Sequence, residues 1–338
     1  SSATQKQRAE AKDLGAELRK TCAPFFLRRE KSEVLAKKPE EEEDVDAKPV
    51  AAPNPKLKKS SWKNVSHAPQ ALGQKNDLIA WIPLDKAQST LYTKFLASKP
   101  VRDAVNKRGS AISCMNTLKK ICDHPALCCV AHQDEEDDET HVENMEEMEE
   151  QQTAEQKKSC AGEAAAAAAS AVRECGFDAD ALESGAASVS SKLRFLMSML
   201  DRFQADGHRT LVFSQSQAML DIIEKNVRAS DKLFVRIDGK VNVEERDRRV
   251  SRFRQNDDIP VMLLTSRVGG LGLTLTEATR VIIYDPAWNP TTDNQSVDRA
   301  YRIGQTKDVV VYRLITCGTV EEKIYRRQVF KGGLSKAG

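Results

Sequence analysis

The chain has 338 residues, 40% of them hydrophobic, and a formal net charge of +2 at pH 7. No run of about 18 apolar residues occurs, and the first residues contain no apolar signal segment, so we expect neither a membrane span nor secretion. The first residue is not Met, which leads us to expect that the chain is cut from a longer protein.

The small net charge hides a strong asymmetry along the chain. Residues 1–130 carry 24 Lys and Arg against 15 Asp and Glu, residues 131–187 carry 3 against 17, and residues 188–338 carry 25 against 18. Two basic blocks on either side of an acidic spacer predict a polyanionic partner for the basic blocks.

The N-terminal third is expected to consist of a helical stretch, a linker and a small ordered segment. Residues 1–35 form a basic stretch that ends in PFFLRREKSEVL, and residues 36–74 have the Lys, Glu, Pro and Ala content typical of a linker. Alternating apolar residues predict a strand within 75–84, and helices are predicted over 86–97 and 110–122.

The eight cysteines show no CxxC pair, which indicates reduced thiols. The cluster Cys122, His124, Cys128 and Cys129 has a spacing that fits no common zinc site. Because the preceding AISCMNTLKKIC is amphipathic, we favour a buried helix end over a zinc site.

Residues 131–187 are predicted to be a disordered spacer. The stretch 134–150 has eleven acidic residues and no Lys or Arg, and six alanines follow at 164–169. Alanine favours a helix, but the segment is not amphipathic enough to predict firm docking. We favour a solvated spacer over a functional acidic tail.

From residue 188 onward, apolar strands alternate with helices. Strands are predicted at 210–214, 233–237, 261–264, 281–284 and 309–315, and helices at 191–203, 216–228, 243–255, 292–301 and 319–331. This order predicts a parallel sheet covered on both faces, that is, a three-layer α/β domain.

Such sheets bind ligands at the carboxyl ends of their strands. Polar residues and glycines follow the predicted strands, and QSVDRAYRIGQ precedes the last one, so we expect all of them to gather on one rim. The residues after the strands are Ser214, Gln215, Asp238, Gly239, Lys240, Thr265, Ser266, Arg267, Asp285, Trp288 and Asn289.

Two arginines and a glycine-rich loop suggest a phosphate ligand. Arg299 and Arg302 are three residues apart and could direct two guanidinium groups at a triphosphate, as arginine fingers do; the alternative is a pair of surface arginines bonded to Asp298. The loop SRVGGLGLTLT at 266–276 could bring backbone N–H groups close to an anion, although an ordinary tight turn explains it equally well.

Other parts of a nucleotide site are missing from the sequence. No GxxxxGK[ST] occurs, and no acidic pair follows an apolar strand as a Mg²⁺ site would need. The sequence therefore predicts half of a nucleotide site, with no metal ligands of its own.

Five motifs in order resemble the C-terminal RecA-like lobe of Swi/Snf-type, superfamily-two DNA translocases. They are TLVFSQSQAMLDIIE, RIDGKVNVEERDRRVSRFRQN, LLTSRVGGLGLTLTEA, VIIYDPAWNP and QSVDRAYRIGQTKDVVVYRL. Within that family, KNDLIAWIPL, LKKICDHPAL and GTVEEKIYRRQVFKGGL are most similar to the group of PICH and the Cockayne syndrome B protein (excision-repair cross-complementing six-like), with KNDLI and EEKIYRRQVFK nearer to PICH.

The resemblance implies a RecA-like helicase C-terminal lobe with a mostly helical remnant of a first lobe and disordered spacers. The implied segments are 1–35 (end of the first motor lobe), 36–74 (linker or insertion), 75–130 (inter-lobe strand and helices), 131–187 (acidic, Ala-rich disordered spacer), 188–318 (C-terminal RecA-like lobe) and 319–338 (brace helix and tail).

The resemblance also implies roles for single residues. Arg299 and Arg302 match arginine fingers, and Tyr301 departs from the His common in the family. The implied ATP-binding residues are Gly270, Gly272, Gln295, Asp298, Arg299 and Arg302. The implied DNA-backbone contacts are Ser214, Gln215, Lys240, Thr265, Ser266, Arg267, Trp288 and Asn289.

The expected function is that of the C-terminal half of a nuclear, ATP-dependent translocase on double-stranded DNA. It would serve DNA repair, chromosome segregation or chromatin remodelling, with a first RecA-like lobe and chromatin proteins as further partners. ATP would bind with Mg²⁺ held by the first lobe, so this chain alone would be inactive. The alternatives are a truncated, non-catalytic module that binds DNA or a partner, and an RNA-directed helicase.

Overall fold

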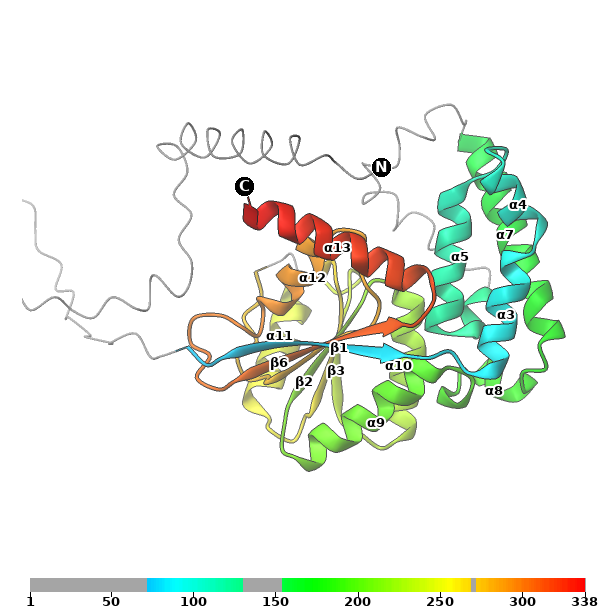
Figure 1. Ribbon diagram of the computed structural model, residues 1–338. Coiled ribbons are helices and arrows are strands. Elements are labelled where there is room, and N and C mark those ends of the chain that lie inside the picture. Colours follow the sequence, from blue (N-terminus) through cyan, green and yellow to red (C-terminus); the bar gives the residue numbers. More distant parts are fainter. Residues whose placement is uncertain (1–71, 130–153, 269–271, 338) are drawn as a thin grey trace, which may run out of the picture. The chain divides into compact units, whose positions relative to one another are not determined.

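The computed structural model describes residues 72–129, 154–268 and 272–337 (Figure 1). The predictions for residues 1–71, for the acidic stretch 134–150 and for Gly270 lie outside the described residues. Among the residues described, no helix has the length and apolar character needed to cross a membrane.

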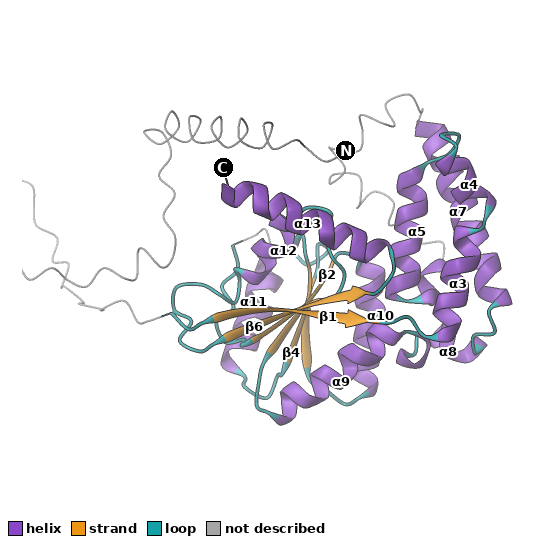
Figure 2. Ribbon diagram, viewed as in Figure 1, coloured by secondary structure: helices purple, strands orange, loops and turns teal. Residues whose placement is uncertain are grey.

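A parallel sheet of six strands forms the centre of the described part (Figures 1 and 2). All neighbouring strands are paired in parallel, and β2 and β4 are buried at every position, as expected for a sheet covered on both faces. The predicted three-layer α/β class is therefore confirmed. In spatial order the strands are β1 (Lys75–Ile82), β6 (Val309–Thr316), β5 (Arg280–Ile283), β2 (Thr210–Ser214), β4 (Val261–Thr265) and β3 (Phe234–Ile237).

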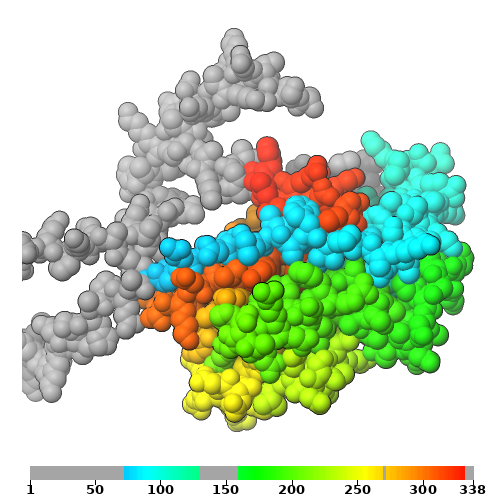
Figure 3. All heavy atoms as spheres, turned by 60° about the horizontal axis from the view of Figure 1, so that its bottom comes forward, coloured from blue at the N-terminus to red at the C-terminus, as the bar shows by residue number. Residues whose placement is uncertain are grey.

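The strand predicted near residue 75 belongs to this same sheet. β1 pairs with β6 along its whole length, from Lys75 opposite Val309 to Ile82 opposite Thr316. The predicted separation of an inter-lobe segment at 75–130 from the lobe is therefore wrong for this strand, because β1 supplies the hydrogen-bonding partner that β6 needs. Figure 3 shows β1 as a cyan band along the molecular surface, as expected for the edge of a sheet.

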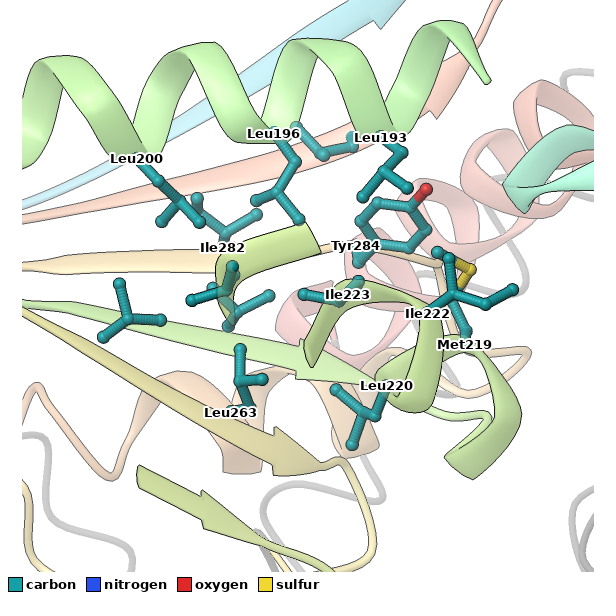
Figure 4. Close-up of a cluster of buried hydrophobic side chains, with 14 of the residues drawn as sticks. Leu193, Leu196, Leu200, Met219, Leu220, Ile222, Ile223, Leu263, Ile282 and Tyr284 are labelled. Carbon is teal, nitrogen blue, oxygen red and sulfur yellow. The ribbon is translucent and has the colours of Figure 1, made fainter. Parts of the chain in front are cut away.

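Helices cover both faces of the sheet. Strand residues alternate between the faces, so Val212 and Ile282 meet α9 (Ser191–Ala205) and α10 (Gln217–Ala229) on one side. Figure 4 shows Leu193, Leu196 and Leu200 of α9 above Ile282 and Tyr284 of the sheet. Full burial of one such leucine contributes about 2 kcal/mol. The predicted helices at 191–203 and 216–228 are thus confirmed, and their apolar faces form the hydrophobic core together with this face of the sheet.

The opposite face is covered by α11 (Val243–Gln255) and α12 (Pro290–Val297). Val250 and Phe253 of α11 and Val297 of α12 are buried against Leu211 and Phe213. The predicted helix at 243–255 is confirmed, whereas the one predicted at 292–301 ends earlier, at Val297. The final helix, α13 (Val320–Ala337), confirms the prediction for 319–331.

Four further helices form a helical arm, defined here as α3 (Lys86–Leu96), α4 (Lys99–Val105), α5 (Ala111–Asp123) and α7 (Ala154–Glu174). Apolar residues of α3, α5 and α7 share one core, which includes Leu91, Phe95, Leu118 and Ile121. β1 leads directly into α3, so the arm leaves the sheet at the ends to which the strands point (Figure 1).

The prediction that residues 154–187 belong to a disordered spacer is wrong. Ala164, Ala168 and Ala171 of α7 lie on one face of the helix and are buried in the core of the arm. Alanine has a small apolar side chain, so a stripe of alanines buries a helix face through close approach rather than through large side chains. A second short helix, α8 (Ala179–Ser184), follows and is capped by Asp178.

The cluster around Cys122 is a buried helix end, as predicted. His124 follows the last residue of α5 and is fully buried. Its Nδ1 accepts a hydrogen bond from Ala126 N at 3.1 Å, and its Nε2 donates to Ala186 O at 3.1 Å. Both ring nitrogens are engaged with the backbone, so neither is available to bind a metal ion, and the ring is held in its neutral form.

This geometry predicts a pH dependence of stability. Burial lowers the pKa of His124 to about 4, whereas an unfolded histidine has a pKa of about 6.5. The stability that the neutral ring contributes is complete above pH 6.5 and is lost as the pH falls through 4. When the pH is lowered from 7.5 to 5, the shifted pKa of His124 should reduce the free energy of unfolding by about 2 kcal/mol.

The measurement is urea unfolding at both pH values for the wild-type protein and for His124→Gln, whose side chain does not titrate. We expect the variant to lose less stability on acidification than the wild type, by about that amount. An identical pH dependence in the two proteins would contradict the assignment.

A buried ionic cluster fixes the arm to the sheet domain. Lys192 of α9 donates to Asp123 of α5 at 2.7 Å and to Glu321 of α13 at 2.5 Å, and its side chain is 0% exposed. Burial alone would lower the pKa of Lys192, but the two carboxylates outweigh it and raise the pKa well above the usual value. Tyr284 Oη also donates to Asp123 O. The cluster therefore joins α5 of the arm to α9, to α13 and to the end of β5.

Candidate functional site

Hydroxyl groups gather at the carboxyl ends of the two central strands. Ser214 at the end of β2 pairs with Thr265 at the end of β4, and Ser266 N donates to Ser214 O at 2.9 Å. All three residues are buried, and Thr265 Oγ1 has no hydrogen-bond partner among the described residues. The predicted set Ser214, Thr265 and Ser266 is therefore brought together in one place.

The neighbouring Gln215 is held by the next strand end. Its backbone N–H points between the two carboxylate oxygens of Asp285, each 3.1 Å away, and its side chain donates to Asp285 O. Burial raises the pKa of Asp285, while the nearby Lys119 and Lys192 oppose that rise. Asp285 thus positions Gln215, a role that the sequence alone did not reveal.

The two residues predicted after β5 have local structural contacts. Trp288 is half-buried, with Lys119 Nζ of the arm 5.9 Å from the centre of its ring. Asn289 is exposed and caps α12 by accepting a hydrogen bond from Thr291 N at 3.0 Å. The first contact places the foot of the arm beside the strand ends.

Lys240 and Arg267, both in the predicted DNA-binding set, have exposed side chains near the ends of β3 and β4. The nearby Arg236 of β3, in contrast, is engaged in the fold. Its guanidinium is paired with Asp221, Glu224 and Asp238 at 2.5 to 3.0 Å. A guanidinium with three carboxylate partners is not free to bind a phosphate.

The two candidate finger arginines lie beyond the end of α12, in turns rather than in a helix. After Val297 the helical bonds shorten to three-residue turns, such as Ala300 N to Val297 O. Arg302 donates to Gly272 O at 3.1 Å, and Leu275 N donates to Arg299 O at 2.8 Å. Gly272 has a φ of 73°, which glycine adopts without strain. Residues 299–302, called the arginine turn below, are thus attached to the loop that follows β4.

The prediction that all these residues share one rim is wrong for the arginines. In a parallel sheet each helix carries the chain back to the amino ends of the strands, so residues after α12 lie at the opposite end from Ser214. The side chain of Gln305 confirms this position, because it donates to Ala278 O, two residues before β5 begins. The loop from Ser266 to Thr279 connects the two ends.

The surroundings of Arg299 favour an anion. Its Nε is buried and makes no hydrogen bond within the described ranges, and burial and the neighbouring Arg302 lower its pKa. Two guanidinium groups that repel each other are stabilised when a polyanion binds between them. Gln295 and Asp298, also predicted to contact the nucleotide, are both exposed on the same segment.

Gln305 is a positioning residue that the sequence did not single out. It is buried, and its side-chain amide lies within hydrogen-bond distance of Thr276 O, Ala278 O and Ala300 O. It therefore clamps the arginine turn onto the loop after β4. The signal available in the sequence was only its place within the RIGQ motif.

The carboxylates near the strand ends do not form a free pair for a metal ion. Asp238 accepts from Arg236 and from Lys240 N, and Asp285 accepts from Gln215 N. The arrangement can bind anions at two places, the hydroxyl-rich strand ends and the arginine turn, and one loop joins them.

Comparisons with known proteins identify the domain to which these strands and helices belong. The family profile described as "Helicase conserved C-terminal domain" matches residues 191–304. The chain is 41% identical to "Protein CHROMATIN REMODELING 24" of Arabidopsis thaliana over 99% of this chain and 27% of that protein. It is also 41% identical to the Homo sapiens "DNA excision repair protein ERCC-6-like" over 92% of this chain and 23% of that protein.

The fold is similar to that of a solved structure, the "Sulfolobus solfataricus SWI2/SNF2 ATPase core in complex with dsDNA". The TM-score is 0.53 at 24% identity, covering 77% of this chain and 45% of the other. This likeness supports the fold. The chain spans about a quarter of the length of the two curated relatives.

Proposed function

Because the chain belongs to the SNF2 family of ATPases and contains its helicase C-terminal domain, we propose that it is the C-terminal half of a motor that moves along double-stranded DNA. One observation carries the proposal. The strand-end hydroxyls and the arginine turn lie at opposite ends of the sheet, and the Arg302–Gly272 contact attaches the turn to the loop that leads back to Thr265. A shift at one end can therefore be transmitted to the other.

In this proposal the residues at the carboxyl ends of the strands bind the DNA backbone. Ser214, Thr265 and Ser266 would offer hydroxyl groups, and Lys240 and Arg267 add positive charge. Such contacts read phosphates rather than base sequence, so binding should weaken as salt rises. Gln215, Trp288 and Asn289 complete the predicted DNA contacts.

ATP would bind at the arginine turn, between this lobe and the first lobe of the whole protein. Arg299 and Arg302 would act as arginine fingers on the phosphates, with Gly270, Gly272, Gln295 and Asp298 around the nucleotide. Bound Mg²⁺ would neutralise charge on the phosphates. Since Asp238 and Asp285 are engaged within the fold, we assign the Mg²⁺ ligands to the first lobe.

The names of two relatives suggest a biological role for the whole protein. One relative is named for chromatin remodelling and another for DNA excision repair. We therefore propose a nuclear protein that works on duplex DNA in repair, chromosome segregation or chromatin remodelling, with chromatin proteins as partners.

The test is ATP turnover of the protein at its natural length, measured alone, with duplex DNA and with RNA. We expect strong stimulation by duplex DNA and weak stimulation by RNA. Stimulation by RNA over DNA would contradict the duplex substrate. Absence of turnover with DNA binding intact would replace the motor with a non-catalytic binding module.

A further inference from the structure

The outer end of the helical arm carries a basic tip, defined here as Lys99, Arg102, Lys107 and Arg108. The first two lie on α4, and the other two lie in the turn that leads into α5. All four side chains are exposed. Between residues 97 and 118 they are accompanied by a single acidic residue, Asp103.

The charges of the basic tip are not used in the fold. Within the described ranges, none of the four side chains forms a salt bridge or a hydrogen bond. Arginines elsewhere behave differently: Arg236 has three carboxylate partners, and Arg249 bonds to Glu245 and to a backbone carbonyl. Four uncompensated positive charges on one short segment make an attractive surface for a polyanion.

The arm that carries the tip is firmly rooted. The ionic cluster of Lys192 joins α5 to α9 and α13. Gln88 of α3 donates to Ile121 O and accepts from Ser191 N, and Ser190 Oγ donates to Asp123 O at 2.7 Å. These buried contacts link the foot of the arm to the sheet domain, so the tip is held at a fixed distance from the strand ends.

The position of the tip matches that of the proposed DNA contacts. The arm stands at the carboxyl ends of the strands, and Lys119 at its foot lies against Trp288 (Figure 1). From Lys119, α5 runs outward for nine residues to Ser110, about 14 Å at 1.5 Å per residue. That distance is the axial length of about four base pairs, so one duplex can contact both places.

We propose that the basic tip is a second contact for the phosphate backbone of the duplex that the strand ends bind, an assignment that rests on the proposed function. The tip presents only flexible basic side chains. It therefore adds affinity and fixes the direction of the duplex without reading base sequence.

The test uses the natural-length protein without nucleotide and measures duplex binding between 50 and 200 mM salt. The tip variant is Lys99→Ala/Arg102→Ala/Lys107→Ala/Arg108→Ala. Each phosphate contact contributes about 0.9 to the slope of log K against log salt. We expect the variant to reduce the slope by about 2 to 4 and to weaken binding by more than about tenfold at 100 mM salt.

A matched control removes the same charge elsewhere. Arg194, Arg202, Lys225 and Arg228 are exposed on α9 and α10, and their simultaneous replacement by Ala should change the slope by less than about 1. If the tip variant and the control variant behave alike, the effect is one of net charge and the proposal fails.

The acidic stretch 134–150 is the competing occupant, since it also carries many negative charges. If the tip variant loses affinity only after deletion of that stretch, the stretch occupies the tip in the natural-length protein, and the proposal for that protein is overturned. The motor proposal is tested separately by DNA-stimulated turnover of the wild-type protein. A slope difference without any such turnover would reject the motor and support the tip contact.

Discussion

Replacement of Arg302 by Ala in the natural-length protein is expected to reduce DNA-stimulated ATP turnover by about 10³-fold or more. An arginine finger stabilises the charge that develops on the phosphates in the transition state, and its removal has effects of that size. Arg302 is exposed, so the loss cannot be ascribed to an emptied core. The measurement is kcat at saturating ATP and DNA, together with duplex affinity. The affinity should change little, because Arg302 lies far from the carboxyl ends of the strands, where we propose that DNA binds.

A control separates chemistry from positioning. Arg302 donates to Gly272 O, and Arg254 of α11 makes an equivalent contact with Thr274 O in the same loop. If Arg302 acts only by holding the loop, Arg254→Ala should reduce turnover equally. We expect Arg254→Ala to cost less than about tenfold and Arg302→Lys to remain impaired, because an ammonium cannot reproduce the bidentate guanidinium contact. Near-normal turnover of Arg302→Ala would reject the finger assignment.

The parts of the fold that the sequence predicted well share a physical cause. The buried strands at 210–214 and 261–264 are continuous apolar runs, and α10, which follows the first of them, has one wide apolar face. In such segments local pattern and tertiary burial favour the same structure. α7 was mistaken for a spacer because its buried face consists of alanines, whose contribution depends on close neighbours that only the fold provides.

Motif order made Thr265 and Arg302 candidates for the site, and their roles stay predictions. It did not reveal that α12 carries the arginines to the amino ends of the strands. The sequence also does not show that Arg236 is paired, because its partners Asp221 and Glu224 lie on a different element. A set of charges that meets only in three dimensions leaves no periodic signal in the sequence.

The ionic cluster of Lys192 is the clearest case of such a set. Asp123 and Glu321 are 69 and 129 positions away from Lys192 in the chain. The three residues lie on three different helices, α5, α13 and α9. From the sequence, Lys192 was an ordinary polar residue at the start of a helix. The structure shows instead that it is fully buried and joins the arm, α9 and the brace helix.

Lys192→Met is therefore expected to destabilise the protein by about 4 kcal/mol. Removing one member of a buried ion pair leaves its partners as uncompensated charges, and such changes have effects of this size. The melting temperature should fall by about 10 °C. The measurement is urea and thermal unfolding at pH 7.5, with a loss below about 1 kcal/mol contradicting a structural role for the cluster.

A triple variant identifies the physical origin of that loss. In Lys192→Met/Asp123→Asn/Glu321→Gln the ammonium and both carboxylates are replaced by neutral groups of similar shape. The amide oxygen introduced by Glu321→Gln can still accept the hydrogen bonds that Thr316 N and Oγ1 donate to the carboxylate. If unpaired charge is the cause, the triple variant should recover most of the stability that the single variant loses. If both variants are equally unstable, the loss comes instead from the packing and hydrogen bonds of the lysine side chain.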